Sequence, residues 1–429
     1  MCYNLFMDIE IEKIIYPGKS LGRYHNKVVL TNEGLPGERV RVSLLKDKKS
    51  FIEAETKDIL ASSTRRVIPK CRHYKVCSPY QYISYPFQLE IKSGQLREIL
   101  LRQAGIDSFD LKIRPSLNEF GYRNKVNLLI ARDNSGVSFA YNSPRNIQGR
   151  VKIDKCFLFP DIINRFLKEL IKIFRSNRFK FIEGITIRIN NKETEMLLGL
   201  KTSNPKQVQG ISRVLNILGK KFPLKGIMLS SSEKRRRKTW GVNYIRENFS
   251  GRDFFIGIDT FFQVNIGSVR EVIRDLSCFF RKAKVNCLAD LYCGTGMFGI
   301  VFSERIKEII GIDSGKENIE FLKQNLEKNR ITNFRAIEGD CRKLISKAFK
   351  YSPDALMVNP PRAGLTENIC RYIIRKKPQK IFYLSCNPVT LSRDLKNLLG
   401  KYTLLNIYLY DFFPQTPHIE TLAVLESIH

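Results

Sequence analysis

Residues 289–300 read ADLYCGTGMFGI, and this stretch decides the expected fold. Gly294, Gly296 and Gly299 follow the spacing G-x-G-x-x-G, after the strand-like run VNCLADLY and before a helical pattern. Glycine lets the backbone turn tightly there and approach a ligand closely. In this context the spacing predicts a strand, a turn and a helix that together bind a nucleoside-bearing cofactor.

The C-terminal part of the chain, residues 251–429, alternates between strand and helix patterns. The expected strands are VNCLADLY, KEIIGID, FRAIEGD, ALMVNPP, KIFYLSC, LLNIYLYDFF and ETLAVLES, with amphipathic segments between the earlier ones. This order predicts a doubly wound α/β domain with a mostly parallel sheet and a hairpin-like end.

Three carboxylates near the ends of these strands indicate which cofactor is bound. Asp313, nineteen residues after Gly294, can hold the ribose hydroxyls of a nucleoside. Asp290, four residues before Gly294, disfavours the pyrophosphate of NAD and suits the positive amino and sulfonium groups of S-adenosylmethionine. Asp340, at the end of FRAIEGD, is expected either to reach the adenine side or to be a simple turn carboxylate. S-adenosylmethionine is therefore the preferred cofactor.

Two other residues stand at strand ends that open on the same crevice. Asn359 begins an Asn-Pro-Pro sequence after one strand, and Cys386 follows the next strand. Because the carboxyl ends of parallel strands converge on the ligand crevice, Asn359, Cys386 and the glycine loop are expected to share one pocket. The Asn-Pro-Pro sequence is similar to the catalytic loop of amino-directed methyltransferases, so methylation of an exocyclic amine is one interpretation. In that reaction Cys386 would have no role.

A thiol at this place favours a second interpretation, methylation of carbon 5 of uracil. A thiolate that adds to carbon 6 makes carbon 5 electron-rich, so that carbon 5 can take a methyl group from a sulfonium. A base must then remove the proton from carbon 5 before the thiol leaves. His418 and Glu420, in DFFPQTPHIETLAVLE, are the candidate bases, although each has an ordinary structural reading as a loop or strand-start residue.

The composition indicates a protein that binds a polyanion. Lys and Arg number 73 against 42 Asp and Glu, a formal net charge of +31, which points to nucleic acid or to an acidic membrane face. No apolar run approaches the ~18 residues that span a bilayer, and the start of the chain lacks a signal-peptide pattern. The ten cysteines are scattered along the chain. We therefore expect a cytoplasmic protein that binds nucleic acid and whose cysteines are mostly free thiols. The sequence does not settle the oligomeric state, for which a monomer is the preferred expectation.

Two segments precede the α/β domain. Residues 1–62 contain about five short strand patterns, which predict a small oligonucleotide-binding β-barrel. Residues 63–250 mix strand and helix patterns and predict an α+β domain. The run KRRRK at residues 234–238 is only a weak indication of phosphate contact, because most charge runs are solvated loops.

Taken together, these motifs resemble the RNA uracil-5-methyltransferase family, in the branch that carries an N-terminal TRAM domain and includes the 23S rRNA (uracil-C5)-methyltransferases. The similar segments are GKSLGR, LPGERVRV, YRNKVNL, FFQVN, DLYCGTGMFGI, SCNPVTLSRDL and DFFPQTPHIE. The resemblance implies a Rossmann-like S-adenosylmethionine methyltransferase domain, a TRAM barrel of the oligonucleotide-binding type, and a central RNA-binding domain.

The resemblance also implies roles for individual residues. Cys386 is the implied nucleophile, which forms a covalent bond to carbon 6, and Glu420 is the implied general base. The expected substrate contacts are Arg123, Phe262 and Asn359. The expected cofactor contacts are Gln263, Asp290, Tyr292, Gly294, Gly296, Asp313, Asp340 and Asn359. The expected substrate is a uridine of 23S rRNA, and the alternatives are the T-loop uridine of tRNA, an amino group, or a non-catalytic RNA-binding role.

Two features depart from the family pattern. Asn359 stands where the family usually has Asp, which exchanges an acceptor-only group for one that also donates. Relatives often hold a four-iron cluster through C-x5-C-x2-C and a distant fourth cysteine. Here Cys71 and Cys77 keep the first spacing and Cys156 matches the fourth ligand, but Tyr80 occupies the third position. The expectation is either a [4Fe-4S] cluster on three thiolates or a decayed site whose cysteines simply pack.

Overall fold

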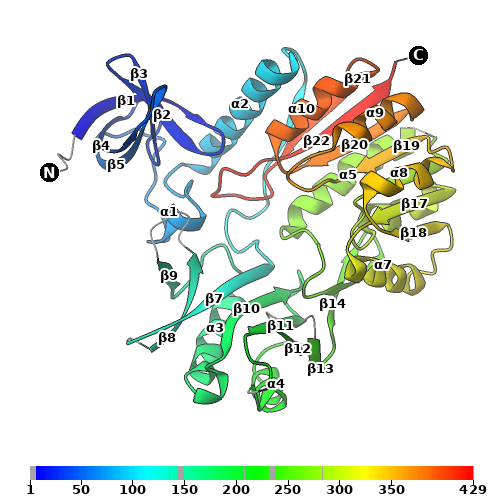
Figure 1. The fold of residues 1–429 in the computed structure, drawn as a ribbon, viewed down its shortest axis with the longest axis horizontal. Coiled ribbons are helices and arrows are strands. Elements are labelled where there is room, and N and C mark those ends of the chain that lie inside the picture. Colours follow the sequence, from blue (N-terminus) through cyan, green and yellow to red (C-terminus); the bar gives the residue numbers. More distant parts are fainter. Residues whose placement is uncertain are drawn as a thin grey trace.

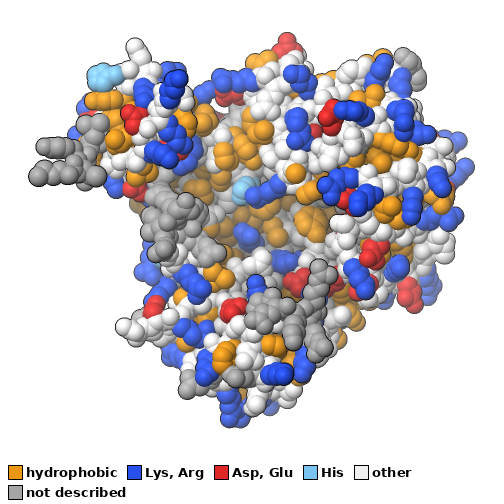
Figure 2. Space-filling model, viewed as in Figure 1, with side chains coloured by type: hydrophobic (Ala, Val, Ile, Leu, Met, Phe, Trp, Pro, Cys, Tyr) orange, Lys and Arg blue, Asp and Glu red, His pale blue; other side chains and the backbone are white. Residues whose placement is uncertain are grey.

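The computed structural model describes residues 6–134, 136–142, 149–206, 208–231, 237–282 and 284–428. Three bodies, a small barrel, a central sheet and a larger C-terminal sheet with helices on both faces, surround a hollow (Figures 1 and 2). Apolar side chains line much of the hollow, and Lys and Arg side chains are spread over the face around it (Figure 2). Residues 234–236 of the predicted basic run lie outside the described residues.

The C-terminal sheet confirms the predicted α/β fold. Its order is β18-β17-β16-β19-β20-β22-β21-β6. Neighbours from β18 to β20 are parallel, whereas β22 runs antiparallel to both β20 and β21. The strands are β6 (Leu111–Arg114), β16 (Cys287–Leu291), β17 (Glu308–Asp313), β18 (Phe334–Glu338), β19 (Ala355–Val358), β20 (Lys380–Ser385), β21 (Tyr402–Tyr410) and β22 (Glu420–Ser427).

Helices cover both faces of this sheet, which explains why its central strands are buried throughout and mostly apolar. On β16, Leu288 packs into one core while Ala289 and Leu291 pack into the other. The first core is completed by α5 (Ile266–Lys282), α6 (Met297–Phe302) and α7 (Lys316–Lys328). The second is completed by α2 (Tyr85–Ala104), α8 (Cys341–Phe349), α9 (Glu367–Lys376) and α10 (Pro388–Leu398). A short 3-10 turn, η2 (Ser303–Arg305), follows α6.

Two packing contacts cross the domain boundaries expected from sequence. Helix α2 packs beside α10 on one face of the C-terminal sheet, and β6 joins that sheet by pairing in parallel with β21, although both elements fall within residues 63–250. The boundary at residue 250 also divides a hairpin, β14 (Tyr244–Phe249) and β15 (Arg252–Gly257), whose apolar side packs into the catalytic core. Strand and helix patterns report that a face is buried but not which body covers it.

The barrel confirms the expectation for the N-terminus. Its closed order is β1-β2-β3-β5-β4, formed by β1 (Phe6–Ile15), β2 (Lys19–Tyr24), β3 (Lys27–Thr31), β4 (Arg39–Asp47) and β5 (Phe51–Ala61). Alternate residues of β1 are buried, as the period of a strand requires. A single-turn helix, α1 (Tyr74–Cys77), lies between the barrel and α2.

The central body is a mixed sheet with two helices, in agreement with the predicted α+β pattern. Its order is β13-β12-β11-β10-β7-β8-β9. The strands are β7 (Lys125–Asp133), β8 (Gly136–Asn142), β9 (Arg150–Ile153), β10 (Ile182–Ile189), β11 (Met196–Thr202), β12 (Leu224–Ser231) and β13 (Arg237–Gly241). Helices α3 (Asp161–Phe174) and α4 (Ile211–Gly219) share its core, and η1 (Asn177–Phe179) is a 3-10 turn. No helix in the described part of the chain has both the length and the apolarity that crossing a membrane requires.

Candidate active site

Cys386 and Glu420 face each other across two paired strands. Strand β20 ends at Ser385, which pairs with Thr421 near the start of the antiparallel strand β22. The next pair outward in this register is therefore Cys386 and Glu420. The thiol and the carboxylate, which lie 34 positions apart in the sequence, are thus brought to the same edge of the sheet.

Burial controls the protonation of this pair. Glu420 is only 2% exposed, and burial raises its pKa to about 8, while the nearby Arg362 opposes that rise. Burial also raises the pKa of the Cys386 thiol, the Glu420 carboxylate raises it further, and Arg362 lowers it. The pair therefore behaves as one coupled unit in which Arg362 is the nearby cation.

The glycine loop borders a narrow cavity of about 20 Å³. Gly294 adopts a φ of +58° and Gly296 a φ of +84°, and a Cβ on Gly296 would lie 2.2 Å from the Leu322 side chain. The cavity is lined by Phe261, Phe262, Gln263, Tyr292, Cys293, Gly294, Thr295, Met297, Phe298 and Asn359. The predicted residues Gln263, Tyr292, Gly294 and Asn359 thus come together here. Their amide groups and aromatic rings suit an amino acid with a sulfonium.

The predicted carboxylates have different surroundings. Asp313 accepts hydrogen bonds from the Gly294 amide at 2.9 Å and the Gly315 amide at 2.8 Å, so it holds the start of the glycine loop. Asp290 is fully buried at the end of β16 and does not line the cavity; burial raises its pKa to about 7, and Asp313 adds to the rise. Asp340 caps α8 and binds Arg342 instead of lining the cavity.

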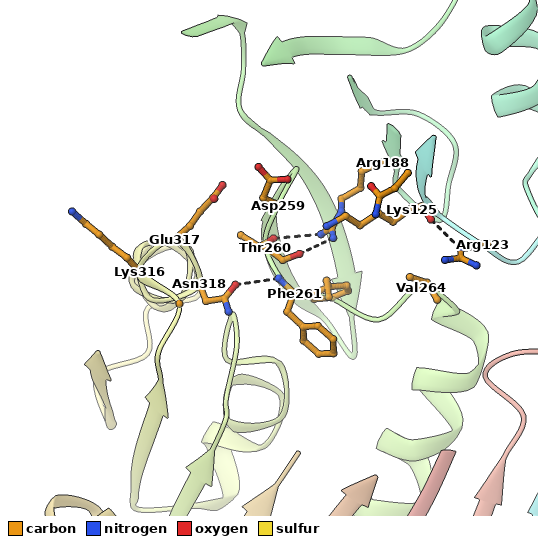
Figure 3. Close-up of a pocket in the computed structure, with 13 residues that line it drawn as sticks. Arg123, Lys125, Arg188, Asp259, Thr260, Phe261, Val264, Lys316, Glu317 and Asn318 are labelled. Atoms are coloured by element: carbon orange, nitrogen blue, oxygen red, sulfur yellow. Dashed lines mark hydrogen bonds between the residues drawn. The ribbon is translucent and has the colours of Figure 1, made fainter. Parts of the chain in front are cut away.

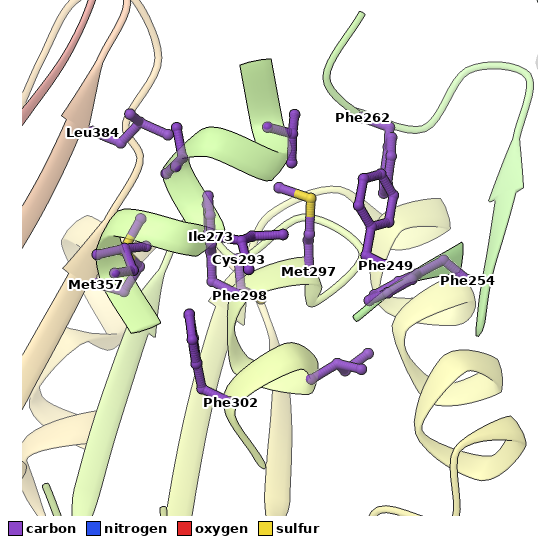
Figure 4. Close-up of a cluster of buried hydrophobic side chains, with 14 of the residues drawn as sticks. Phe249, Phe254, Phe262, Ile273, Cys293, Met297, Phe298, Phe302, Met357 and Leu384 are labelled. Atoms are coloured by element: carbon purple, nitrogen blue, oxygen red, sulfur yellow. The ribbon is translucent and has the colours of Figure 1, made fainter. Parts of the chain in front are cut away.

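The two adjacent phenylalanines have opposite environments. Phe262 is 6% exposed and packs against Phe249 and Phe254 in the core (Figure 4). Phe261 is 56% exposed, lies against Gly294, and borders both the cofactor cavity and a second, larger cavity. The side chain that can stack on a base is therefore that of Phe261 rather than the predicted Phe262, which the run of two apolar residues in FFQVN could not distinguish.

The larger cavity, of about 520 Å³, lies between the central sheet and the start of α7 (Figure 3). Lys125 is the first residue of β7, Arg123 lies in the segment just before it, and Arg188 comes from β10. Figure 3 shows these three cations along one wall, with Lys316 and Asn318 of α7 across from them. Arg123, which was predicted as a substrate contact, thus faces a cavity that adjoins Phe261.

The comparisons with known proteins agree with this geometry. The sequence profile of the tRNA (Uracil-5-)-methyltransferase family matches residues 84–428. The chain belongs to that family. It is 28% identical over 446 residues to an uncharacterised RNA methyltransferase of Synechocystis sp., covering 99% of this chain and 96% of the relative. An uncharacterised RNA methyltransferase of Clostridium acetobutylicum is 28% identical over 444 residues, covering 97% and 96%.

A solved structure extends the similarity to the whole fold. The tRNA (uracil-54, C5)-methyltransferase of Pyrococcus abyssi, crystallised with S-adenosyl-L-homocysteine, matches with a TM-score of 0.77 and 26% identity. The match covers 98% of this chain and 100% of the other. The family and the fold identify an RNA (uracil-C5)-methyltransferase that uses S-adenosylmethionine.

In this methyltransferase, helix α2 holds the loop between β21 and β22. Lys92 of α2 donates to Asp411 at 2.7 Å and to the Phe413 carbonyl at 3.1 Å, and both side chains of this ion pair are 0% exposed. Gln88 and Gln415 exchange two hydrogen bonds of 2.9 Å. The loop leads directly into Glu420, so α2 fixes the place of that carboxylate.

Two further side chains, those of Tyr122 and His418, pack at the loop between β21 and β22. The Tyr122 hydroxyl donates to the Pro414 carbonyl at 3.1 Å, so Tyr122 holds the loop from the central body. His418 packs against the ring of Phe413. Burial lowers the pKa of His418 to about 4, with Arg362 adding to the effect. A neutral imidazole with so low a pKa is a weak proton acceptor, which leaves Glu420 as the better base.

Sequence reasoning missed two residues beside the thiol. Arg362 follows the Asn-Pro-Pro sequence, and its carbonyl accepts from Asn387 at 3.0 Å at the start of α10. Tyr16, in the turn between β1 and β2, packs against the catalytic core, and burial raises its pKa while Cys386 adds to the rise. The position of Arg362 after Asn-Pro-Pro was a usable signal, whereas nothing in the barrel sequence indicated that its turn reaches the catalytic edge.

The cysteines expected to hold an iron–sulfur cluster do not fit one. Cys71, Cys77 and Cys156 line one narrow gap beside α1, but no three Cys, His, Asp or Glu side chains of the described residues lie close enough to hold a metal ion. Burial raises the pKa of Cys156 to about 12, with Cys77 adding to the rise, so this thiol stays protonated. Tyr80 does not line the gap; it is buried near the barrel and accepts from Gln95 at 3.2 Å. Of the two alternatives expected from sequence, this arrangement supports the decayed site with packed thiols rather than a [4Fe-4S] cluster.

Proposed function

We propose that this enzyme methylates carbon 5 of a uridine in folded RNA through a covalent bond between Cys386 and carbon 6. The observation that carries the proposal is the pairing of Cys386 with Glu420 at the edge of the sheet where the cofactor loop also opens. An amino-group methyltransferase needs neither side chain, and a non-catalytic RNA-binding protein needs no such pair.

The proposed reaction uses the two side chains in sequence. The Cys386 thiolate forms a bond to carbon 6, and the electron pair of the 5,6 double bond moves to carbon 5. S-adenosylmethionine supplies the methyl group, which carbon 5 accepts. Glu420 then takes the proton from carbon 5, the sulfur–carbon bond breaks, and the double bond is restored. Arg362 supports the thiolate form because it lowers the pKa of Cys386.

The same residues suggest how the cofactor and the base are placed. Gln263, Tyr292 and Asn359 are proposed to hold the methionine part of the cofactor, with Asp313 on the ribose side. Asp290 stays buried behind the loop and is proposed to act only at a distance. Asn359, at the mouth, can both donate to and accept from a uracil edge.

Phe261 is proposed to stack on the flipped uracil, so Phe261→Ala should weaken catalysis without weakening the fold. Base–aromatic stacking contributes ~1–3 kcal/mol, so kcat/KM for RNA should fall by about one order of magnitude or somewhat more. The matched variant Phe262→Ala removes a buried ring and should instead cost ~3–5 kcal/mol of stability. Steady-state kinetics and urea unfolding of both variants check this; a destabilised Phe261→Ala protein would contradict the assignment.

Methylation should increase with pH through and beyond the pKa of Glu420. Because burial raises that pKa to about 8, the folded enzyme holds the acid form at lower pH, and the carboxylate population falls about tenfold per pH unit below it. Cys386 deprotonation changes in the same direction, and the pKa of this thiol is raised from its ordinary value of 9.0. We expect kcat/KM to increase steeply up to about pH 8 and to keep increasing more gradually above about pH 8.5, as more of the thiolate forms. Binding of S-adenosylhomocysteine, measured in the same buffers, should stay constant.

The RNA substrate has two candidates. By its resemblance to the ribosomal RNA enzymes the chain favours 23S rRNA. The Pyrococcus abyssi relative is a tRNA (uracil-54, C5)-methyltransferase whose structure matches 98% of this chain, barrel included, so the barrel does not discriminate between the two. Uridine 54 of tRNA is therefore the second candidate. The free thiols of the described cysteines suit a reducing compartment where both RNAs occur.

Mass mapping of 5-methyluridine tests the proposed function. Ribosomal RNA and tRNA from cells with and without this protein should differ at one uridine, and the purified enzyme should restore the methyl group on RNA from the deficient cells. A methyl group that appears on an exocyclic amine would replace this proposal with the amino-group alternative. No transfer to either RNA would favour a binding-only role.

A further inference from the structure

The cavity of about 520 Å³ beside Phe261 has an excess of positive charge on one wall. Arg123, Lys125 and Arg188 face it from the central sheet (Figure 3). The two carboxylates of the cavity, Asp259 and Glu317, are both bound by Arg237, which donates to Glu317 at 2.9 Å. Both carboxylates are thus paired with Arg237, which is not one of the three cations on the wall.

Arg188 is buried in the wall of this cavity. It is 2% exposed and donates to the Thr260 carbonyl at 2.7 Å and to the Thr260 hydroxyl at 3.3 Å, while its Nε has no hydrogen-bond partner. A buried guanidinium with an unused donor is costly unless a ligand supplies an acceptor. Burial lowers the pKa of Lys125 to about 8 and Arg188 lowers it further, while Asp259 and Glu317 oppose this decrease. The two cations therefore lie close together, and the carboxylates offset only part of the combined effect of burial and repulsion.

The position of the cavity indicates which ligand would offset the repulsion between Lys125 and Arg188. Phe261 and Phe262 line both this cavity and the cavity beside the glycine loop. A ligand bound in the larger cavity therefore lies next to a base stacked on the Phe261 ring. The volume is that of a site for a small molecule or a single nucleotide. Arginine and lysine side chains recognise phosphate oxygens, Arg by its planar fork and Lys as a point charge.

We propose that this cavity binds the RNA phosphodiester and nucleotide that flank the target uridine, with Arg188 and Lys125 facing the phosphate. The proposal rests on the proposed function, because it takes the occupant of Phe261 to be the target base. Binding here would hold the neighbouring backbone while the uracil turns toward Cys386. Part of the cost of unstacking the target base would be offset by this contact.

Lys125→Met tests the proposal, because it removes one charge and keeps the length of the side chain. The probe is a single-stranded oligouridylate of about ten nucleotides, a length within the site sizes of single-strand binders. We expect its affinity at ~0.1 M salt to fall about fivefold to tenfold, and the slope of log K against log salt to become shallower by about 0.7. Binding of S-adenosylhomocysteine should not change.

The matched control is Lys168→Met, on the exposed face of α3 in the same body, which should bind like the wild type. Equal losses of affinity and equal salt slopes in the two variants would overturn the proposal. If the wild type transfers no methyl group to RNA, the proposed function fails; if it is active while the two variants bind alike, only this inference fails.

A second measurement does not depend on how the variant folds. With a pKa of about 8, the Lys125 amine of the wild type should react with an amine-directed acetylating reagent near neutral pH. Saturating oligouridylate should protect Lys125 several-fold and leave Lys168 unprotected, as read by peptide mass spectrometry. Equal labelling of Lys125 with and without the RNA would overturn the proposal.

Discussion

Cys386→Ala is expected to abolish formation of 5-methyluridine, with a loss of at least ~10⁴-fold in kcat. Without the sulfur, carbon 5 of uracil never becomes electron-rich enough to accept a methyl group, so no other side chain can compensate. The variant should still bind S-adenosylhomocysteine, because Cys386 does not line the cofactor cavity. Transfer of labelled methyl groups to RNA from the deficient cells measures the loss.

Two comparisons make this result specific to the covalent step. Cys278→Ala, an exposed thiol on α5, should be fully active. RNA that contains 5-fluorouridine should form a denaturant-stable complex with the wild type and with Cys278→Ala, and none with Cys386→Ala, because fluorine cannot leave as a proton does. Retained turnover in Cys386→Ala would refute the covalent mechanism and favour the amino-group reaction.

Lys92→Met is expected to destabilise the catalytic domain by ~3–5 kcal/mol, the cost of leaving one partner of a buried ion pair alone. The variant keeps the apolar stem but leaves the Asp411 carboxylate without its cation in a site where both side chains are 0% exposed. The loop from Asp411 to Glu420 should loosen, so kcat should fall more than tenfold. Urea unfolding and steady-state kinetics measure the two effects.

Matched variants identify the origin of this loss. Lys13→Ala removes a partly exposed ion pair between the barrel and Glu98 of α2 and should cost less than ~1 kcal/mol. The double variant Lys92→Met/Asp411→Leu leaves no buried charge and should recover most of the stability. If kcat recovers as well, the ion pair acts only through the fold; if kcat stays low, the polar contact itself positions the loop. A Lys92→Met protein as stable as the wild type would contradict the assignment.

The local sequence was enough to place the residues of the candidate site at the ends of strands. The glycine spacing, Asp313, Cys386 and Glu420 each lie at the end of an element whose period was readable, and all seven predicted strands of the C-terminal sheet form. The rule that parallel strands converge at their carboxyl ends then brings the glycine loop and Cys386 together without knowledge of the full fold. The cofactor class and the reaction type were therefore predictable, while the catalytic pair of Cys386 and Glu420 stays a prediction.

Other parts of the site depend on contacts between distant segments. Lys92 and Asp411 lie 319 positions apart, and no periodicity in α2 could predict which loop it holds. The choice of Phe261 over Phe262 required knowing which ring the core covers. Asp340 had the same sequence signal as Asp313, yet it caps a helix.

By itself the sequence determined the fold class and the glycine loop, and it predicted Cys386 and Glu420 as the reacting pair, because each is written in short-range patterns of burial and turn chemistry. Only the tertiary structure decided that α2 covers the C-terminal sheet and β6 joins it, that the barrel turn with Tyr16 lies near the thiol, and that three cysteines of the described residues lie together without forming a metal site. The physical reason is that the pattern of residues adjacent in the sequence specifies whether a side chain is buried. The protonation state and the hydrogen-bond partners of a buried group depend instead on the distant segment that packs over it.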